Sequence, residues 1–167
     1  MRVADYMGKT LAELGISKAF MLSGTGSIYL DDAVAHQENI DFICARHEAA
    51  AVAMAIAASK LDGTLGVVIA TTGPGGGNAI GGVIEAWVDS VPILVISGQV
   101  QTGQIDPEAR SFGVQGFNII ENVQHITKYA AQLTEPNDIK LEIDKAIYHA
   151  FEGRPGPVWL DVPLDIQ

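Results

Sequence analysis

Cysteine is almost absent from this sequence, and basic residues are scarce. Cys44 is the single cysteine among 167 residues, so there is no disulfide framework, and a reducing cytoplasm is the expected compartment. Ten lysines and arginines stand against 20 aspartates and glutamates, giving a formal net charge of −10. Such an acidic balance argues against nucleic acid and against an anionic membrane surface as partners.

Long hydrophobic runs are missing as well. No apolar stretch reaches the ~20 residues that a membrane-spanning helix needs, and residues 1–5 lack the apolar core of a secretory signal. The four histidines, at positions 36, 47, 125 and 149, lack the spacing of a metal site, so we expect no metal ligand on this chain. A hydrophobic share of 48% with 18% charged residues is typical of a globular chain rather than a disordered one.

Short apolar runs alternate with helical patterns along the chain. This alternation indicates βαβ units and a three-layer α/β/α fold, in which a six-stranded, mostly parallel sheet has helices on both faces. The length suits a single domain over residues 1–167. We expect strands at 18–22, 40–44, 65–71, 92–97, 127–133 and 157–162, and helices at 3–14, 28–37, 48–60, 79–89 and 136–150.

An alanine-rich helix is expected to begin directly after Arg46-His47, with Glu48 in its first turn. Backbone N–H groups there lack helical partners and the helix dipole favours a negative charge. The helix is apolar nearly all round, so we expect it to be buried, and a carboxylate at its mouth needs a partner. Taken alone, Glu48 is most simply a helix stabiliser worth ~0.3–1 kcal/mol.

Residues 72–78 form the most glycine-dense loop of the chain. A P-loop would end in Gly-Lys-Ser/Thr, and this loop does not. Asn78 stands where the dinucleotide fingerprint has its third glycine. Its glycines are therefore predicted to admit close approach of the backbone to a flat ring or to another chain. For Gly76 and Gly77 individually, a tight turn is an equally good explanation.

Four segments occur in the order of one family: Arg46-His47-Glu48, residues 71–78, residues 91–99 and residues 153–158. Together they resemble the N-terminal, pyrimidine-binding domain of the thiamine-diphosphate enzymes, nearest to the acetohydroxyacid (acetolactate) synthase group. The resemblance covers essentially the whole chain. It implies a 2-oxo acid substrate and decarboxylation with or without transfer of the aldehyde unit to a second oxo acid, which is lyase or transferase chemistry. We also expect a homodimer or larger assembly, formed through the apolar helices.

The resemblance gives individual residues roles. The family's glutamate hydrogen-bonds the aminopyrimidine ring nitrogen of thiamine diphosphate and activates the cofactor, and Glu48 occupies that position. The positions that line the family's pyrimidine pocket correspond to Thr71, Pro74, Gly75 and Asn78. Gln115 resembles a glutamine that the synthases hold near the reacting centre, although it could equally be an ordinary polar residue of the long irregular segment 99–118.

Two departures from the family pattern shape these expectations. Residues 22–26 replace the usual Gly-x-Pro-Gly-Gly turn on the substrate side, so the substrate need not be pyruvate. The chain also has no Gly-Asp-Gly, the motif with which the family binds diphosphate and Mg²⁺ on a second domain. We therefore expect half of an active site that is inactive alone and needs a diphosphate-binding domain or subunit. Use of FAD, which the family carries on its middle domain, is left open.

A different class of function also fits the α/β pattern. The chain could be a non-catalytic module that binds a nucleotide or a flavin, or one that serves only in assembly with a partner protein. The two hypotheses separate at Glu48, because a scaffold gives no reason for an acid at that position.

Overall fold

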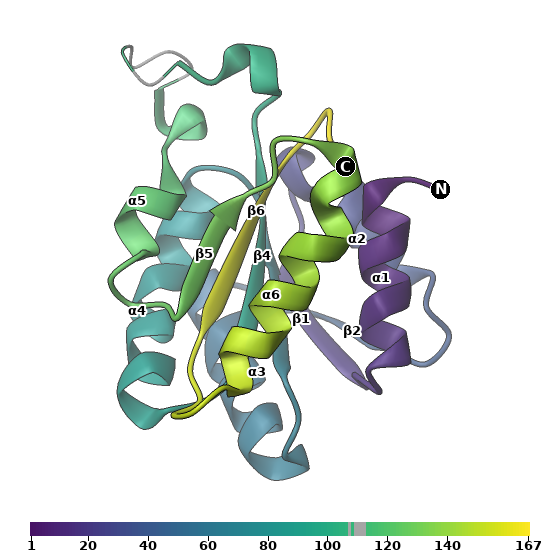
Figure 1. Ribbon diagram of the computed structural model, residues 1–167, viewed down its shortest axis with the longest axis vertical. Coiled ribbons are helices and arrows are strands. Elements are labelled where there is room, and N and C mark those ends of the chain that lie inside the picture. The colour runs from purple at the N-terminus through teal and green to yellow at the C-terminus, as the bar shows by residue number, and fades with distance from the viewer. Residues whose placement is uncertain (107, 109–112) are drawn as a thin grey trace.

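The computed structural model describes residues 1–106, 108 and 113–167, apart from the side chain of Val114. Within them a six-stranded sheet has the order β2-β1-β3-β4-β6-β5, and all five strand pairs are parallel, which confirms the expected fold class (Figure 1). The strands are β1 (Lys18–Leu22), β2 (Asp41–Cys44), β3 (Gly66–Ala70), β4 (Ile93–Gln99), β5 (Tyr129–Gln132) and β6 (Val158–Pro163). The helices are α1 (Val3–Glu13), α2 (Ile28–Ala35), α3 (Glu48–Asp62), α4 (Pro74–Asp89), α5 (Ile119–Val123) and α6 (Ile139–Phe151).

The sheet lies between two layers of helices. Helices α1, α2 and α6 cover one face, and α3, α4 and α5 cover the other (Figure 1). Each helix layer encloses a hydrophobic core against the sheet. Along β3 the side chains alternate, with Val67 and Ile69 in the core beneath α1, α2 and α6 and Val68 in the core beneath α3, α4 and α5. Every residue of β3 and β4 is buried, as near-continuous apolar runs in the middle of a parallel sheet should be.

Helix α4 begins earlier than the sequence pattern predicted. We expected residues 72–78 to form a loop and the helix to start near residue 79, but Pro74 is the first helical residue. The fixed φ of proline suits that position, and Gly73, at φ 62, makes the turn from β3 into the helix. Residues 75–77 are therefore a helical turn, which brings the start of α4 close to the start of α3.

The burial predicted for α3 is only partly correct. One face packs on the sheet and on α4 through residues such as Val52 and Ile56. The other face exposes Ala50, Ala53 and Ala57 to solvent. Because alanine occurs on both the buried and the exposed face of α3, the sequence pattern could not distinguish the two faces. The predicted end of this helix is confirmed, because Gly63 caps it in a left-handed conformation at φ 68.

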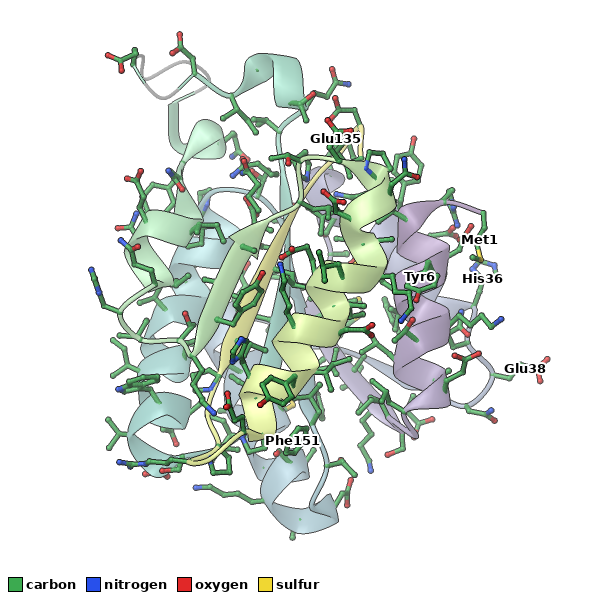
Figure 2. The ribbon with its side chains drawn as sticks, viewed as in Figure 1. Met1, Tyr6, His36, Glu38, Glu135 and Phe151 are labelled. Carbon is green, nitrogen blue, oxygen red and sulfur yellow. The ribbon has the colours of Figure 1, made fainter. Side chains whose placement is uncertain are left out.

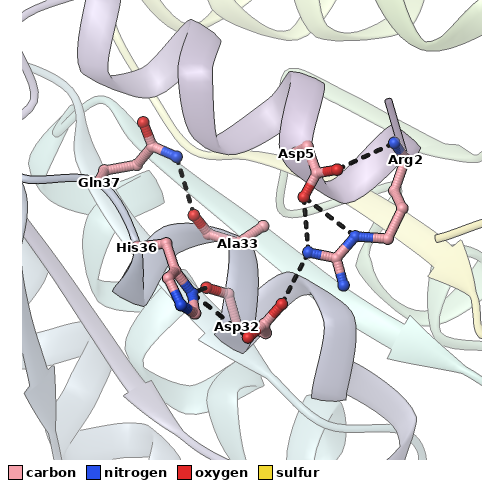
Figure 3. Close-up of polar contacts among 6 residues, drawn as sticks. All are labelled: Arg2, Asp5, Asp32, Ala33, His36 and Gln37. Carbon is pink, nitrogen blue, oxygen red and sulfur yellow. Dashed lines mark hydrogen bonds and ion pairs between the residues drawn. The ribbon is translucent and has the colours of Figure 1, made fainter.

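Polar contacts join α1 to α2 (Figure 3), and one glycine allows the two helices to approach. The Arg2 guanidinium donates to Asp5 at 2.6 Å and to Asp32 at 2.7 Å. Gly8 lets the helices approach, since a Cβ there would lie 2.9 Å from the Ala33 carbonyl oxygen. Nearby, the side chain of His36 points outward from the fold (Figure 2). These contacts hold the helix pair α1 and α2 together.

The ends of the described chain meet, because the Ala4 N–H donates to the Gln167 carbonyl oxygen at 3.0 Å. The predicted irregular segment after β4 contains the short 3-10 turns Thr102–Gln104 and Gly113–Gly116. Pro107 and the Ser111-Phe112 pair next to the Gln115 motif lie outside the described residues. In the part of the chain that the structure describes, no helix is long and apolar enough to cross a membrane.

Candidate functional site

The first turns of α3 and α4 lie side by side and bring Glu48 and Asn78 together. Asn78 Nδ2 donates a hydrogen bond to Glu48 Oε2 at 3.0 Å. The helices approach closely because Gly82 faces Val52, and a Cβ on that glycine would lie 2.6 Å from the valine Cβ. Glu48 is 4% exposed, so its carboxylate is a buried group held by a neutral donor.

The N-terminal cap of α3 is supplied by His47, to which the sequence analysis gave no role. His47 has extended backbone, and its Nδ1 accepts a hydrogen bond from the Ala49 N–H at 3.2 Å. The Glu48 side chain is therefore not needed as a cap and is turned toward α4. This geometry weakens the explanation of Glu48 as no more than a helix stabiliser.

The second oxygen of Glu48 lies beside Gly75 and is not engaged by any described residue. A Cβ added to Gly75 would lie 3.4 Å from Glu48 Oε1 and 2.8 Å from Thr71 Cγ2. Oε1 accepts no hydrogen bond from a described residue, and it is not among the fully enclosed polar atoms that lack a partner. Its lone pairs are thus available to an incoming N–H or protonated nitrogen.

Thr71 stands just after β3, at the point where the strand order reverses. The chain leaves β1 toward β2 and leaves β3 toward β4, so the crevice between the carboxyl ends of β1 and β3 is the topological switch point. Thr71 Oγ1 accepts a hydrogen bond from the Gly26 N–H at 3.2 Å. A Cβ on Gly24 would lie only 2.4 Å from the same oxygen. Thr71 therefore ties together the two loops that border the crevice.

The predicted pyrimidine-pocket residues thus gather in one place. Glu48, Thr71, Gly75 and Asn78 are linked by the contacts above, and Pro74 is exposed at the start of α4 beside them. Gln115 is not in contact with this group. Its carbonyl oxygen accepts a hydrogen bond from Thr72 Oγ1 at 2.7 Å, and its side chain is exposed.

A cavity of about 340 Å³, here called the glutamine cleft, opens next to Thr72 at the carboxyl ends of the strands. Its polar lining consists of Thr25, Thr72, Gln99, Gln101, Gln104 and Gln115. Because Thr25 and Thr72 belong to the loops after β1 and β3, the cleft adjoins the switch point, where ligands of such sheets bind. The sequence analysis identified Gln115 but not the three other glutamines.

A buried polar network beneath the cleft was also missed by sequence reasoning. Asp161 is completely buried in β6. Its Oδ1 accepts a hydrogen bond from the Ser97 hydroxyl at 2.5 Å, and its Oδ2 accepts from Gln99 Nε2 at 3.1 Å and from Gln132 Nε2 at 2.8 Å. Trp159 Nε1 donates to Ser97 Oγ at 2.8 Å and closes the network.

The network also holds the segment that carries Gln115. Gln99 Nε2 donates to the Phe117 carbonyl oxygen at 3.0 Å, and Gln99 Oε1 accepts from the Val100 N–H at 2.9 Å. Thr72 Oγ1 lies 3.1 Å from Gln99 Oε1 and 2.7 Å from the Gln115 carbonyl oxygen. The buried end of β4 is therefore connected through two side chains to the backbone around residues 115–117.

Burial raises the pKa of Asp161 to about 6, although hydrogen bonds from Ser97, Gln132 and Gln99 oppose the rise. The pKa of Asp31 in α2 is likewise raised to about 6 by burial, against hydrogen bonds from Ser27 and from the Gly24 backbone. Asp31 Oδ1 is enclosed and has no partner among the described residues. The one available sequence signal for Asp161 was an acid within the otherwise apolar predicted strand 157–162.

A larger cavity of about 480 Å³ lies at the opposite end of the sheet, between Trp87, Lys128 and Arg154. Lys128 precedes β5 and Arg154 precedes β6, so this cavity is at the amino ends of the strands and away from Glu48. Size alone does not make it the site, because the carboxyl ends are where parallel sheets bind ligands. Among the described residues no three histidine, cysteine, aspartate or glutamate side chains could hold a metal ion.

The fold and this arrangement define a class of protein: a parallel α/β domain that presents a buried glutamate at its topological switch point. Residues 1–132 match the family model described as thiamine pyrophosphate enzyme, N-terminal TPP binding domain, and the chain belongs to that family. This confirms the resemblance seen in the sequence motifs.

The chain is similar to several acetolactate synthases. The chain is 40% identical over 159 residues to the acetolactate synthase large subunit of Lactococcus lactis, covering 95% of this chain and 27% of the relative. It is 36% identical over 163 residues to the acetolactate synthase isozyme 3 large subunit of Escherichia coli, covering 98% and 28%. It is 35% identical over 164 residues to the chloroplastic acetolactate synthase of Arabidopsis thaliana, covering 98% and 24%. The chain thus spans about a quarter of the length of these relatives.

Proposed function

We propose that this chain forms the pyrimidine-binding half of a thiamine-diphosphate-dependent enzyme that acts on a 2-oxo acid, as an acetolactate synthase does. Thiamine diphosphate, when bound, would supply a nucleophilic carbon and an electron sink for decarboxylation of the oxo acid. The observation that carries the proposal is the buried Glu48 carboxylate, with one oxygen held by Asn78 and the other open beside Gly75. The family and its acetolactate synthase members support the choice of cofactor.

Each residue of the group has a part in this proposal. Glu48 Oε1 holds a proton at the ring nitrogen of the aminopyrimidine, and Asn78 orients the carboxylate through Oε2. Gly75 lets the first turn of α4 pack closely on Thr71, because any Cβ there would meet the threonine methyl group. Diphosphate and Mg²⁺ are assigned to a diphosphate-binding domain or subunit, and whether the product is an aldehyde or a condensed acid depends on that complete enzyme.

Thermal unfolding tests the binding half of the proposal. If the protein recognises only the pyrimidine end, thiamine and thiamine diphosphate should stabilise it equally, by about 2.7 kcal/mol at 100 times the dissociation constant. Stabilisation by a flavin or by ADP, without any by thiamine, would instead support the non-catalytic binding module.

The chemical half of the proposal is tested by Glu48→Gln. Glutamine keeps the size and hydrogen-bonding reach of the side chain but cannot transfer the proton, so binding of thiamine should survive. In the enzyme assembled with its diphosphate-binding half, turnover should fall at least about 100-fold. Glu85→Gln, an exposed substitution on α4, is the matched control. Near-normal turnover of Glu48→Gln would refute the role of Glu48.

A second copy of the chain is the partner proposed for the α3 and α4 surface. Ala53 and Ala57 on α3 and Ile84 and Val88 on α4 are exposed, and the two helices lie side by side. Ala53→Glu should shift the mass measured by light scattering to that of a monomer, whereas Ala35→Glu on α2 should not. A monomeric protein before any substitution would rule out this homodimer.

A further inference from the structure

The glutamine cleft has a neutral lining, which is unusual in a chain as rich in acid as this one. Among the described residues its walls contain carboxamides, hydroxyls and the apolar side chains of Val100 and Leu164, but no ionisable group. The carboxylate of Asp161 beneath it is completely buried and engaged by three donors, and that of Asp165 beside it accepts two hydrogen bonds from Thr102. The cleft therefore offers hydrogen bonds without a compensating charge.

Not every carboxamide of the cleft is available to a ligand. Both N–H bonds of Gln99 and its oxygen are engaged inside the protein. Gln104 Oε1 accepts the Gln101 N–H at 3.2 Å, which leaves the Gln104 amide hydrogens free to donate. The exposed Gln115 side chain bonds no described residue, although its backbone is held through Thr72. Gln104 and Gln115 thus have amide groups able to contact a ligand, as does the exposed Gln101, and Gln99 forms a fixed wall behind them.

We propose that the glutamine cleft binds the neutral, hydroxyl-bearing part of a small substrate, beyond its reacting carbon atoms. The identification of that ligand as the substrate rests on the proposed function. Amide groups both donate and accept, as hydroxyl and carbonyl groups do, so they pair well with such a ligand. An apolar tail in the same place would cover Gln104 and Gln115 and leave their donors without partners.

The carboxylate end of a 2-oxo acid does not belong in this cleft. No described side chain there carries a positive charge, and the chain has a net charge of −10. Neutral amide dipoles replace the hydration of a carboxylate poorly when no cation is present. The anionic end is therefore bound by groups outside the cleft, and the cleft selects among substrates by their remaining part.

The test is a nuclear magnetic resonance titration of the side-chain amide signals of ¹⁵N-labelled protein with two neutral probes. Dihydroxyacetone carries the hydroxyl groups that the proposal requires, and acetone is its matched apolar counterpart. For a ligand of six non-hydrogen atoms, a dissociation constant of about 10–100 mM is expected. Dihydroxyacetone should shift the Gln104 and Gln115 amide signals with saturation, and acetone should not.

Substitutions locate the effect. Gln104→Leu and Gln115→Leu should each weaken dihydroxyacetone binding about 5–10-fold, the value of one hydrogen bond. Gln124→Leu, at an exposed position after α5, should leave it unchanged. Equal binding of acetone, insensitivity to both substitutions, or tighter binding of pyruvate than of dihydroxyacetone at these signals would overturn the proposal. If thiamine does not stabilise the protein against thermal unfolding, but dihydroxyacetone still shifts the Gln104 and Gln115 amide signals, the proposed function is refuted and binding in the cleft is not.

Discussion

The stability of this protein should fall as the pH rises from about 4 to 7, and Asp161 should be a principal cause. Burial raises the pKa of this carboxyl group from 3.8 to about 6 in the folded protein. The folded state thus holds the proton more tightly than the unfolded state, so the stabilisation is complete below about pH 4 and is lost as the pH passes 6. The difference amounts to about 3 kcal/mol, at 1.36 kcal/mol per pH unit.

Urea unfolding at pH 4.5, 5.5, 6.5 and 7.5, followed by tryptophan fluorescence, measures this effect. Trp159 reports directly, because its Nε1 donates to the Ser97 hydroxyl that bonds Asp161. About 2 kcal/mol of this difference is lost between pH 4.5 and 7.5, so with a urea dependence of about 1–3 kcal/mol per M the midpoint should move by about 0.7–2 M. The comparison that isolates Asp161 is the difference between the unsubstituted protein and Asp161→Asn at each pH.

Other titrating groups cancel in that difference. Asp31 also has a pKa of about 6 and contributes in the same direction, while the lowered pKa values of Asp5 and Asp165 act in the opposite direction. Asp161→Asn leaves a donor where two amides expect an acceptor, so it should be less stable than the parent at low pH and approach it at neutral pH. Parallel pH profiles for the two proteins would refute the reasoning.

Two further predictions concern packing and the segment around Gln115. Gly82→Ala should destabilise the protein by about 1–3 kcal/mol, since the new Cβ would meet Val52 at 2.6 Å. Gly81→Ala has open space and should stabilise the protein by about 0.5–1 kcal/mol. Thermal unfolding of the two variants measures both effects, and equal effects would contradict the packing of α3 on α4. Gln99→Leu removes the donor to the Phe117 carbonyl oxygen and should cost about 2–4 kcal/mol. Hydrogen exchange near residues 113–118 should then accelerate, and unchanged protection would argue against that anchor.

Patterns among residues close together in the sequence determined many of the strands and helices of this protein. The apolar runs at residues 66–70 and 93–97 are strands because side chains of a central strand are buried on both faces. Helix α3 begins at Glu48 and stops at Gly63 for reasons contained within a few residues, a charged first turn and a left-handed cap. The family motifs, being short and ordered, located Glu48 and Asn78 in the same way.

Where local signals compete, the sequence pattern was less reliable. The glycines at 75–77 favour a loop by intrinsic preference, yet they form the first turn of α4, because Pro74 starts the helix and the glycines allow close contact. Gly75 faces Thr71 and Glu48, and Gly76 faces Ile119, contacts that belong to other elements. Tertiary packing here outweighs an intrinsic cost of roughly 1 kcal/mol per glycine.

Only the tertiary structure decided which polar groups meet. The hydrogen bond from Asn78 to Glu48 joins residues 30 apart in the chain, and that from Ser97 to Asp161 joins residues 64 apart. Glu48 and Asn78, predicted as site residues by motif, are brought together by the fold, whereas the Asp161 network and three of the four glutamines of the cleft were not found from the sequence. Periodicity reports the environment of a residue along its own element, whereas a hydrogen-bond partner depends on how parallel strands are ordered, and that order is set by the whole fold.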